Sequence, residues 1–391
     1  MKITVALLFG GKSVEHEISI ISALQAAQSL NPEKYSVIPV YISKSGEMYC
    51  GDKIGDIEQY KDLQALLSCS YQVTFARVDQ RPAIIKIAPK MFQKPLVAYI
   101  DVALPVVHGT NVEDGTIAGY LNMVGVPYAG CDVLSAALSM DKYAMKVIFK
   151  SRGIPVLDCV VLDSPEAVED EACITKIEKK ISYPMIVKPI NLGSSVGISK
   201  ANNREKLLEA VADAFLYAKK VIVERAITNL TEVNCSVLGN ERLASASVCE
   251  RPVGSDEILS YDDKYIGGSK GSKGMASTKR IIPADITDEQ TRAIQDYAVK
   301  AFRALGCSGV SRIDFMIDND TGEIFLNEIN SIPGSLAFYL WEASGKRYQE
   351  LLDEIISLAL ERDRQQSKIT YAFNTNVLSG VHLKGTKGGK M

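Results

Sequence analysis

Apolar strands and a helix alternate over the first 43 residues, and this alternation limits the possible folds more than any other feature of the chain. Residues 3–10 (ITVALLFG) and 36–43 (SVIPVYIS) have the composition of buried strands. Between them, residues 18–30 carry apolar side chains at helical spacing. A strand, a helix and a second strand in this order predict a βαβ unit in an α/β fold.

The length of 391 residues predicts several domains, since a single core stops growing at roughly 250–300 residues. We place domains at 1–130, 131–222 and 223–362, followed by a polar tail at 363–391. The second domain is expected to begin with one helix over residues 132–153.

The third domain is expected to open with the strands VIVERAI and TEVNCSVLG. Thr287 and Gln290 form a capping-box pattern before its long helix. Gly306 supplies a left-handed residue at the end of that helix, as Gly153 does for the helix that opens the second domain.

The composition excludes several classes of partner. The net charge of −3 offers no broad surface for nucleic acid or an anionic membrane. No apolar run reaches the roughly 18–20 residues that a membrane helix needs. Eight cysteines without a CxxC pair are expected to be reduced thiols. We therefore expect a cytoplasmic protein whose partners are small molecules.

A GGKS sequence at residues 10–13 suggests a phosphate-binding P-loop, but the spacing is wrong, because that motif needs a glycine where this chain has Ala6. We favour a strand-to-helix turn whose glycines let a ligand approach the backbone, with helix amides that attract an anion. Glu15 follows this turn. It either meets a cationic amine or simply stabilises the helix dipole.

A second candidate loop, HGTNVEDG, ends the strand predicted at 102–109 and precedes a helix predicted at 116–125. Ligands of open α/β sheets lie at the carboxyl ends of strands, so this loop and the first one are candidate walls of a site. His108 is the best placed of the three histidines, although a lone histidine more often has a structural role.

Lys188 ends the apolar strand MIVKP, and the loop NLGSSVG follows at 191–197. Backbone N–H groups and the hydroxyls of Ser194 and Ser195 can meet phosphate oxygens while the lysine neutralises their charge. The alternative is a mobile hairpin with an exposed lysine. We favour phosphate contact, because an unpaired ammonium is costly to bury in an apolar strand.

The strands GVSRIDFMID and EIFLNEIN flank a turn, NDTG, and predict a hairpin. Side chains two apart share a face, so Arg312 lies beside Asp314 and Glu328 beside Asn330. Pairing in register puts Asp314 opposite Glu328, where like charges crowd unless a cation separates them. Such oxygen ligands suit Mg²⁺ held with phosphates. The alternative is a surface arginine–carboxylate cluster, worth about 0–1 kcal/mol. We favour the metal, because the hairpin is followed by the glycine–proline loop INSIPGS, which suits the close approach of a ligand to the backbone.

Glu224 ends the strand VIVE and is followed by Ala226 and Ile227. Adenine needs one acceptor and one donor, which this strand end can offer. On its own this signal is weak.

Seven segments in order over residues 3–360 resemble the D-alanine–D-alanine ligase family of the ATP-grasp superfamily. They are LFGGKSVEHEIS, VVHGTNVEDGTIAGYLNMVGVPYAG, ALSMDK, PMIVKPINLGSSVGIS, VIVERAI, SRIDFMID and LNEINSIPG. The ordered set is specific for the superfamily, and GGKSVEHEIS with HGTNVEDGT narrows it to this family. The resemblance implies a three-domain α/β ATP-grasp fold with a Rossmann-like N-terminal domain, and ATP held between the other two domains.

The resemblance also implies the roles of individual residues. The implied ATP contacts are Lys142, Lys188, Ser194, Ser195, Glu224, Ala226, Ile227, Glu232, Lys264 and Asn327. The implied catalytic groups are Glu15, Ser194, Lys264, Tyr265, Arg312 and the Gly334 amide. The implied substrate contacts are Glu15, His108, Tyr339 and Leu340, and the implied ligands of two Mg²⁺ or Mn²⁺ ions are Asp314, Glu328 and Asn330.

In the implied reaction, the carboxylate of a first D-alanine attacks the γ-phosphate of ATP to give an acyl phosphate, and a second amine then displaces phosphate. Glu15 holds the first ammonium, Lys264 reaches the γ-phosphate, and Arg312 faces the oxyanion. The resemblance also suggests a homodimer and a role in making peptidoglycan precursors.

Two departures from the family pattern leave the second substrate open. Tyr339 stands where the pattern has a serine that meets the second carboxylate, and Leu259 stands where one loop aromatic is expected, although Tyr261 remains. The leading hypothesis is D-alanine–D-alanine ligation. The alternatives are a ligase that accepts D-serine, D-lactate or another acceptor, and a non-catalytic nucleotide or amino-acid sensor.

Overall fold

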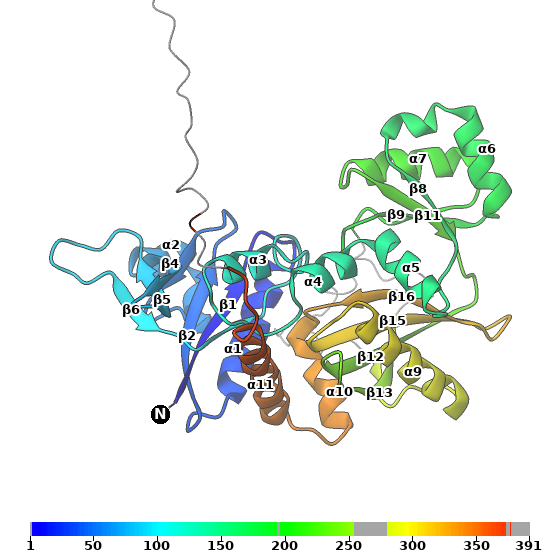
Figure 1. The fold of residues 1–391 in the computed structure, drawn as a ribbon. Coiled ribbons are helices and arrows are strands. Elements are labelled where there is room, and N and C mark those ends of the chain that lie inside the picture. The colour runs from blue at the N-terminus through cyan, green and yellow to red at the C-terminus, as the bar shows by residue number, and fades with distance from the viewer. Residues whose placement is uncertain (1, 194–195, 254–279, 373–375, 377–391) are drawn as a thin grey trace, which may run out of the picture.

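The computed structural model describes residues 2–193, 196–253, 280–372 and 376 (Figure 1). Three sheets organise this part of the chain, with seven, four and five strands. The predicted α/β class is confirmed. Among the described residues, no helix has both the length and the apolar character needed to cross a membrane.

The first sheet has the order β6-β5-β4-β3-β2-β1-β7, in which β1 pairs in parallel with β2 and β7, while the remaining strands extend it in antiparallel fashion. Its strands are β1 (Ile3–Gly10), β2 (Tyr35–Ile42), β3 (Met48–Cys50), β4 (Tyr71–Val78), β5 (Arg81–Lys86), β6 (Leu96–Tyr99) and β7 (Val102–Pro105). Its helices are α1 (His16–Ser29), η1 (Ile57–Lys61), α2 (Leu63–Ser68) and α3 (Thr116–Met123). The βαβ prediction is confirmed, although the strand expected at 102–109 ends four residues earlier, at Pro105.

The alternation of side chains along β1 explains how both faces of this sheet are covered. Val5 and Leu7 pack with α1, whereas Ala6 and Leu8 pack in the core that contains α3. Both helices thus flank the carboxyl ends of β1 and β7, where the two candidate loops begin.

The second sheet is antiparallel, in the order β10-β9-β11-β8, with its apolar core against α6 and α7. Its elements are β8 (Cys159–Leu162), η2 (Pro165–Val168), α6 (Glu171–Lys180), β9 (Met185–Pro189), β10 (Ser199–Ala201), α7 (Arg204–Phe215) and β11 (Val221–Arg225). The boundary expected at residue 222 therefore falls inside β11, which pairs with β9 and β8.

The third sheet is also antiparallel, in the order β14-β13-β12-β15-β16. Its elements are β12 (Leu230–Gly239), β13 (Ala244–Pro252), β14 (Arg280–Ile281), α9 (Asp288–Ala304), β15 (Gly309–Asp318), β16 (Ile324–Asn330), η4 (Gly334–Ala337) and α10 (Phe338–Ala343). The capping box of Thr287 and Gln290 at the start of α9 is confirmed, as is the left-handed Gly306 after it.

The single helix expected over 132–153 is wrong, because the chain breaks it into α4 (Val133–Met140) and α5 (Lys142–Ser151). Asp141 has extended backbone angles, and its carboxylate accepts hydrogen bonds from the N–H groups of Tyr143 and Ala144, so it caps a new helix. Buried residues of α5, including Met145, pack in the core of the third sheet.

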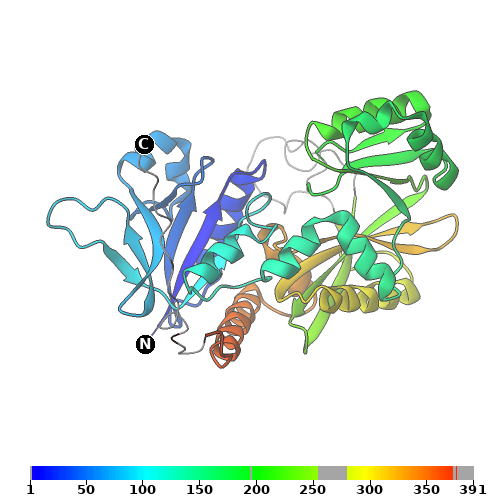
Figure 2. The same cartoon turned by 45° about the horizontal axis from the view of Figure 1, so that its top comes forward.

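Helix α11 (Tyr348–Gln366) joins the first and third domains, and both views place it beside the first sheet (Figures 1 and 2). Leu351 and Leu352 of this helix share one apolar core with β1 and α1. Trp341 of α10 belongs to the same core. The loops of the first domain are thereby held against the end of β16.

Candidate active site

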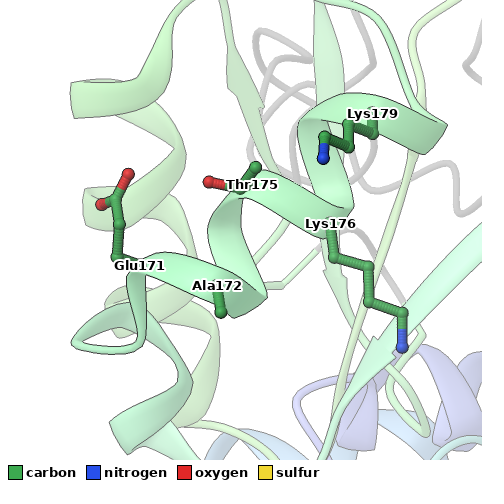
Figure 3. Close-up of a pocket in the computed structure, with 5 residues that line it drawn as sticks. All are labelled: Glu171, Ala172, Thr175, Lys176 and Lys179. Carbon is green, nitrogen blue, oxygen red and sulfur yellow. The ribbon is translucent and has the colours of Figure 1, made fainter.

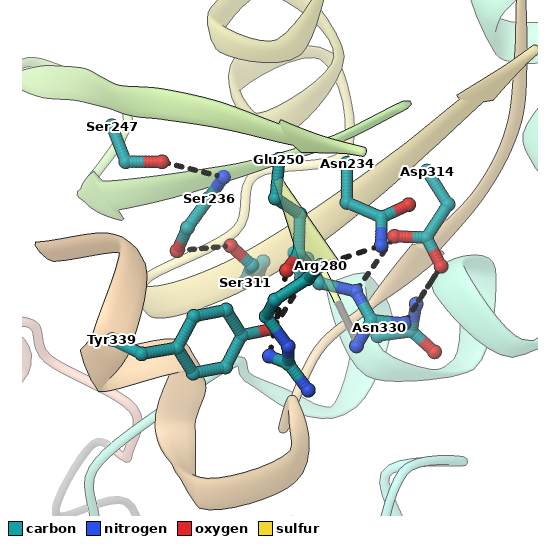
Figure 4. A network of polar contacts seen from close by, with 10 residues as sticks. Asn234, Ser236, Ser247, Glu250, Arg280, Ser311, Asp314, Asn330 and Tyr339 are labelled. Carbon is teal, nitrogen blue, oxygen red and sulfur yellow. Dashed lines mark hydrogen bonds and ion pairs between the residues drawn. The ribbon is translucent and has the colours of Figure 1, made fainter. Parts of the chain in front are cut away.

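Four polar residues form a row across the third sheet, on four successive strands. Asp314 pairs with Glu328 on one side and with Asn234 on the other, and Asn234 pairs with Glu250. Residues directly opposite in an antiparallel sheet point to the same face. The predicted register of the hairpin is therefore confirmed, and the row extends two strands beyond it (Figure 4).

Arg312 lies two residues from Asp314 on the same face of β15 and forms a two-pronged ion pair with it, at 2.7 Å and 2.8 Å. Asn330, opposite Arg312, donates a hydrogen bond of 3.0 Å to Asp314 Oδ2. Burial and the nearby charges of Glu328 and Glu250 raise the pKa of Asp314 even though Arg312 opposes them.

Lys142, the first residue of α5, connects this face to the loop after β9. Its ammonium lies 3.5 Å from Glu328 Oε2 and donates a 2.6 Å hydrogen bond to the carbonyl of Leu192. The backbone N–H of Lys142 donates to the carbonyl of Ile190. The cap at Asp141 therefore positions a buried lysine between Glu328 and the loop that follows β9.

Lys188 on β9 and Lys146 on α5 both pair with the carboxylate of Glu224 on β11. All three side chains are buried, and Glu224 is only 1% exposed. Burial alone would raise the pKa of Glu224, but the two ammonium groups outweigh it and lower that pKa to about 2. Lys188 also donates a 3.1 Å hydrogen bond to Asn327 Oδ1, which ties the second sheet to the third. The cluster keeps one excess positive charge beside the loop.

The predicted adenosine contacts lie just after β11. Ala226 and Ile227 are half-buried, and the Ala226 N–H donates to the carbonyl of Pro184. Glu232 is half-buried on β12. The carboxylate of Glu224, a further predicted adenosine contact, pairs with two buried lysines.

The first-domain loops meet the same site. His108 Nδ1 lies 2.9 Å from the carbonyl oxygen of Ile332, directly after the hairpin. Its Nε2 is buried and has no hydrogen-bond partner among the described residues. Burial lowers the pKa of His108 despite the opposing charge of Glu15, so the imidazole is neutral. The side chain of Glu15 makes no capping hydrogen bond to α1.

Glu113 in the second loop accepts a 2.8 Å hydrogen bond from the N–H of Gly109. Burial and the charge of Glu15 raise the pKa of Glu113 to about 8, with a smaller contribution from Glu328. The carboxylates of the first-domain loops and of the hairpin therefore interact electrostatically.

The residues after the hairpin form a strained turn. Gly334 begins it, and Ser335, Leu336 and Ala337 all have positive φ, between 49° and 53°. A left-handed non-glycine residue costs roughly 1–2 kcal/mol, so packing must hold the turn. The N–H of Ser335 donates to Ser22 Oγ of α1 at 3.1 Å.

Tyr339 and Leu340, the two residues predicted to contact the second substrate, lie in different surroundings. Tyr339 donates its hydroxyl to Glu250 Oε1 at 2.9 Å, so this hydroxyl is already used within the protein. Leu340 is fully buried, so its side chain packs in the protein interior rather than facing a substrate.

Four predicted site residues, Ser194, Ser195, Lys264 and Tyr265, lie outside the described residues, as do Leu259 and Tyr261. Three residues of the site were not predicted from the sequence: Lys146, Asn234 and Glu250. Lys146 lies one helical turn after Lys142, and this spacing could have identified it from the sequence.

A shallow hollow on α6 contains none of the predicted site residues (Figure 3). Its lining residues are Glu171, Ala172, Thr175, Lys176 and Lys179. They lie on the outer side of the second domain, and we assign them no part in the site.

Two antiparallel sheets, with the buried lysines of β9 and α5 beside the row of polar residues on the third sheet, are the arrangement of an ATP-grasp enzyme, an ADP-forming ligase. Family models described as D-ala D-ala ligase N-terminus and D-ala D-ala ligase C-terminus match residues 4–131 and 148–357. The chain therefore belongs to the D-alanine–D-alanine ligase family, whose members depend on ATP.

Individual relatives agree with this assignment. A D-alanine–D-alanine ligase from Caldicellulosiruptor bescii is 42% identical over 379 residues, which cover 95% of this chain and 99% of that protein. The VanG D-Ala:D-Ser ligase from Enterococcus faecalis has a TM-score of 0.77 at 32% identity, covering 92% of this chain and 100% of that structure. The D-alanine–D-alanine ligase from Coxiella burnetii has the same TM-score, 0.77, at 29% identity, covering 94% of this chain and 96% of that structure.

Proposed function

We propose that this enzyme joins two D-alanine molecules, releasing ADP and phosphate, and so supplies a dipeptide for peptidoglycan precursors. The observation that carries the proposal is the pairing of Asp314 with Glu328 and of Arg312 with Asn330 on one face of the hairpin. Family membership over nearly the full chain supports it.

ATP would lie between the second and third sheets. Lys142 and Lys188 would contact the phosphates, since each ammonium lies beside a residue of β16 in the third sheet. Lys146 and Glu224 would hold Lys188 in place. The strand end at Ala226 and Ile227, with Glu232 and Asn327, would take the adenosine, and Ser194, Ser195 and Lys264 would add phosphate contacts.

The chemistry of the donor set at Asp314, Glu328 and Asn330 fits two Mg²⁺ or Mn²⁺ ions held together with phosphates. Asp314 and Glu328 lie directly opposite each other on paired strands, and a divalent cation between them would relieve the repulsion of their charges. When bound, such ions would neutralise charge on the transferring phosphoryl group. Groups of three or more acidic, histidine or cysteine ligands are absent among the described residues, so phosphate oxygens would complete the coordination.

The first D-alanine would place its ammonium at Glu15 and its carboxylate toward Arg312. An oxygen of that carboxylate attacks the γ-phosphorus, the bond to the β-phosphate oxygen breaks, and ADP leaves. The amine of the second D-alanine then attacks the acyl carbon, phosphate leaves, and one proton is lost from nitrogen. Arg312 and the Gly334 amide would stabilise the developing oxyanion, while Tyr265 and Ser194 would help to position Glu15.

A second candidate is the same chemistry with a different acceptor. The similarity to the VanG D-Ala:D-Ser ligase and the engaged hydroxyl of Tyr339 both favour testing it. A non-catalytic sensor is set aside, because the family consists of enzymes.

The test is product analysis with the purified protein, ATP, Mg²⁺ and D-alanine. We expect release of one phosphate for each D-alanyl-D-alanine formed. Release of phosphate only when D-serine or D-lactate is added would move the assignment to the second candidate. No phosphate release with any acceptor would overturn both.

A further inference from the structure

Arg280 lies on the same face of the third sheet as the row of polar residues. It is the first residue of β14 and pairs with Pro252 of β13. Glu250 is two residues before Pro252 on that strand, so the three side chains share a face. Arg280 therefore extends the polar row by one more strand, beyond Glu250.

The side chain of Arg280 is fixed from two directions. Its guanidinium lies over the ring of Tyr339, 4.1 Å from the ring centroid. One terminal nitrogen, Nη1, lies 3.4 Å from Glu250 Oε2, and only 14% of the side chain is exposed (Figure 4). A guanidinium stacked on a ring is held in a fixed plane, which the ammonium of a lysine could not reproduce.

Glu250 and Tyr339 are themselves held, so the plane of the guanidinium is defined. Glu250 Oε1 accepts hydrogen bonds from Tyr339 at 2.9 Å and from Asn234 at 3.0 Å. Asn234 is the strand partner of Asp314. Burial opposes the charge of Arg312, but Asp314 and, to a smaller extent, Glu250 raise its pKa. The contacts of Glu250 and Asn234 therefore connect Arg280 to the groups that would face the acyl phosphate.

We propose that Arg280, stacked on Tyr339 and oriented by Glu250, binds the carboxylate of the second substrate and so selects acceptors that carry a free carboxylate. This inference rests on the proposed function. It explains how the chain can lack a serine at position 339: the tyrosine does not contact the carboxylate but supplies the surface on which an arginine lies. A planar arginine can bind a carboxylate through two parallel hydrogen bonds. Arg280 is in this sense a specificity residue, and Tyr339 and Glu250 are positioning residues.

The experiment is a competition between two acceptors, D-alanine and D-alaninamide, in one reaction with ATP and Mg²⁺. The two products differ by a terminal amide and are separated by mass spectrometry. The ratio of products reports carboxylate selection and is insensitive to a uniform loss of activity. For Arg280→Gln we expect this ratio to fall about tenfold to hundredfold relative to the wild type, as the loss of a charged hydrogen-bonded pair predicts. Arg280→Lys should keep part of the preference, because it retains the charge without the planar fork.

Arg251→Gln is the matched control, since Arg251 is the next residue after Glu250, points to the other face of β13 and pairs with Asp285 at 2.7 Å. Its product ratio should match the wild type. If Arg280→Gln does not fold, Tyr339→Leu removes the ring under the guanidinium and should lower the same ratio. An unchanged ratio in a folded Arg280→Gln or Tyr339→Leu enzyme would overturn the inference.

Failure of the proposed function gives a different result. If the wild type makes no dipeptide from D-alanine, the proposed function falls, and the same competition with D-serine and D-serinamide decides the role of Arg280. A wild type that forms dipeptide while both acceptors remain equally good in every variant would overturn only the role of Arg280.

Discussion

The ammonium of Lys146 lies 2.5 Å from Glu224 Oε2, and both side chains are buried. Glu224 also pairs with Lys188, so one carboxylate holds two lysines from two different elements, α5 and β9. Lys146 additionally donates to the carbonyl of Leu157 at 3.2 Å. This arrangement fixes Lys188 at the position from which it would contact a phosphate.

The first prediction concerns Lys146→Gln. The change removes one of the two ammonium groups that stabilise the buried carboxylate of Glu224, so we expect the free energy of unfolding to fall by roughly 1.5–3 kcal/mol. We also expect weaker ATP binding, because Glu224 would then pair with Lys188 alone and offset more of the positive charge that Lys188 offers to a phosphate. Chemical denaturation and a nucleotide titration measure the two effects. Lys150→Gln, on an exposed lysine one turn further along α5, should change neither by much.

The second prediction concerns Glu328→Gln. The proposed metal ligand loses its charge but keeps its shape, so we expect the turnover rate to fall at least about a hundredfold. The affinity for ATP should change far less, since Lys142 and Lys188 remain. Steady-state kinetics with a separate nucleotide titration distinguishes the two quantities. Glu323→Gln, at the exposed turn of the same hairpin, is the control, and a Glu328→Gln enzyme with the turnover of the control would refute the metal assignment.

The hairpin could be predicted from the sequence because its information is local. Alternating side chains and the turn NDTG fix which residues lie opposite each other. The same local pattern does not predict that Asn234 and Glu250 belong to the site. The pairing of β12 with β15 joins residues about 80 positions apart, such as Asn234 and Asp314. Strand order of this kind depends on tertiary packing.

The helix break at Asp141 shows a different limit. The apolar spacing over 132–153 continues through this residue, so periodicity predicts one helix. An aspartate inside a helical pattern is also a helix-capping residue, and tertiary contacts decided between the two. Lys142, the first residue of α5, owes its position to that cap. The pairing of Lys146 with Glu224 likewise became visible only in the folded chain.

The third prediction concerns Tyr339→Ser. A serine is too short to reach Glu250 and offers no ring to Arg280, so we expect the KM for the second substrate to rise about tenfold. The KM for ATP should stay within about twofold, because the proposed nucleotide contacts lie on elements other than α10. Tyr339→Phe is the comparison: it keeps the ring and loses only the hydrogen bond to Glu250. An unchanged acceptor KM in Tyr339→Ser would remove Tyr339 from the site.

The fourth prediction is a pH dependence of stability that depends on Glu113. Burial and Glu15 raise the pKa of Glu113 to about 8, above the ordinary value of 4.5. Between these two pH values the folded protein holds a proton that the unfolded chain releases, so stability falls as the pH rises, by at most about 1.4 kcal/mol for each pH unit. Glu113→Gln cannot titrate, yet its amide oxygen can still accept from Gly109. We therefore expect the variant to gain stability relative to the wild type as the pH rises from 5 to 8, with no further change above that. Urea unfolding at pH 5.5, 6.5 and 7.5 measures this difference, and a difference that is constant across the three values would contradict a buried, protonated Glu113.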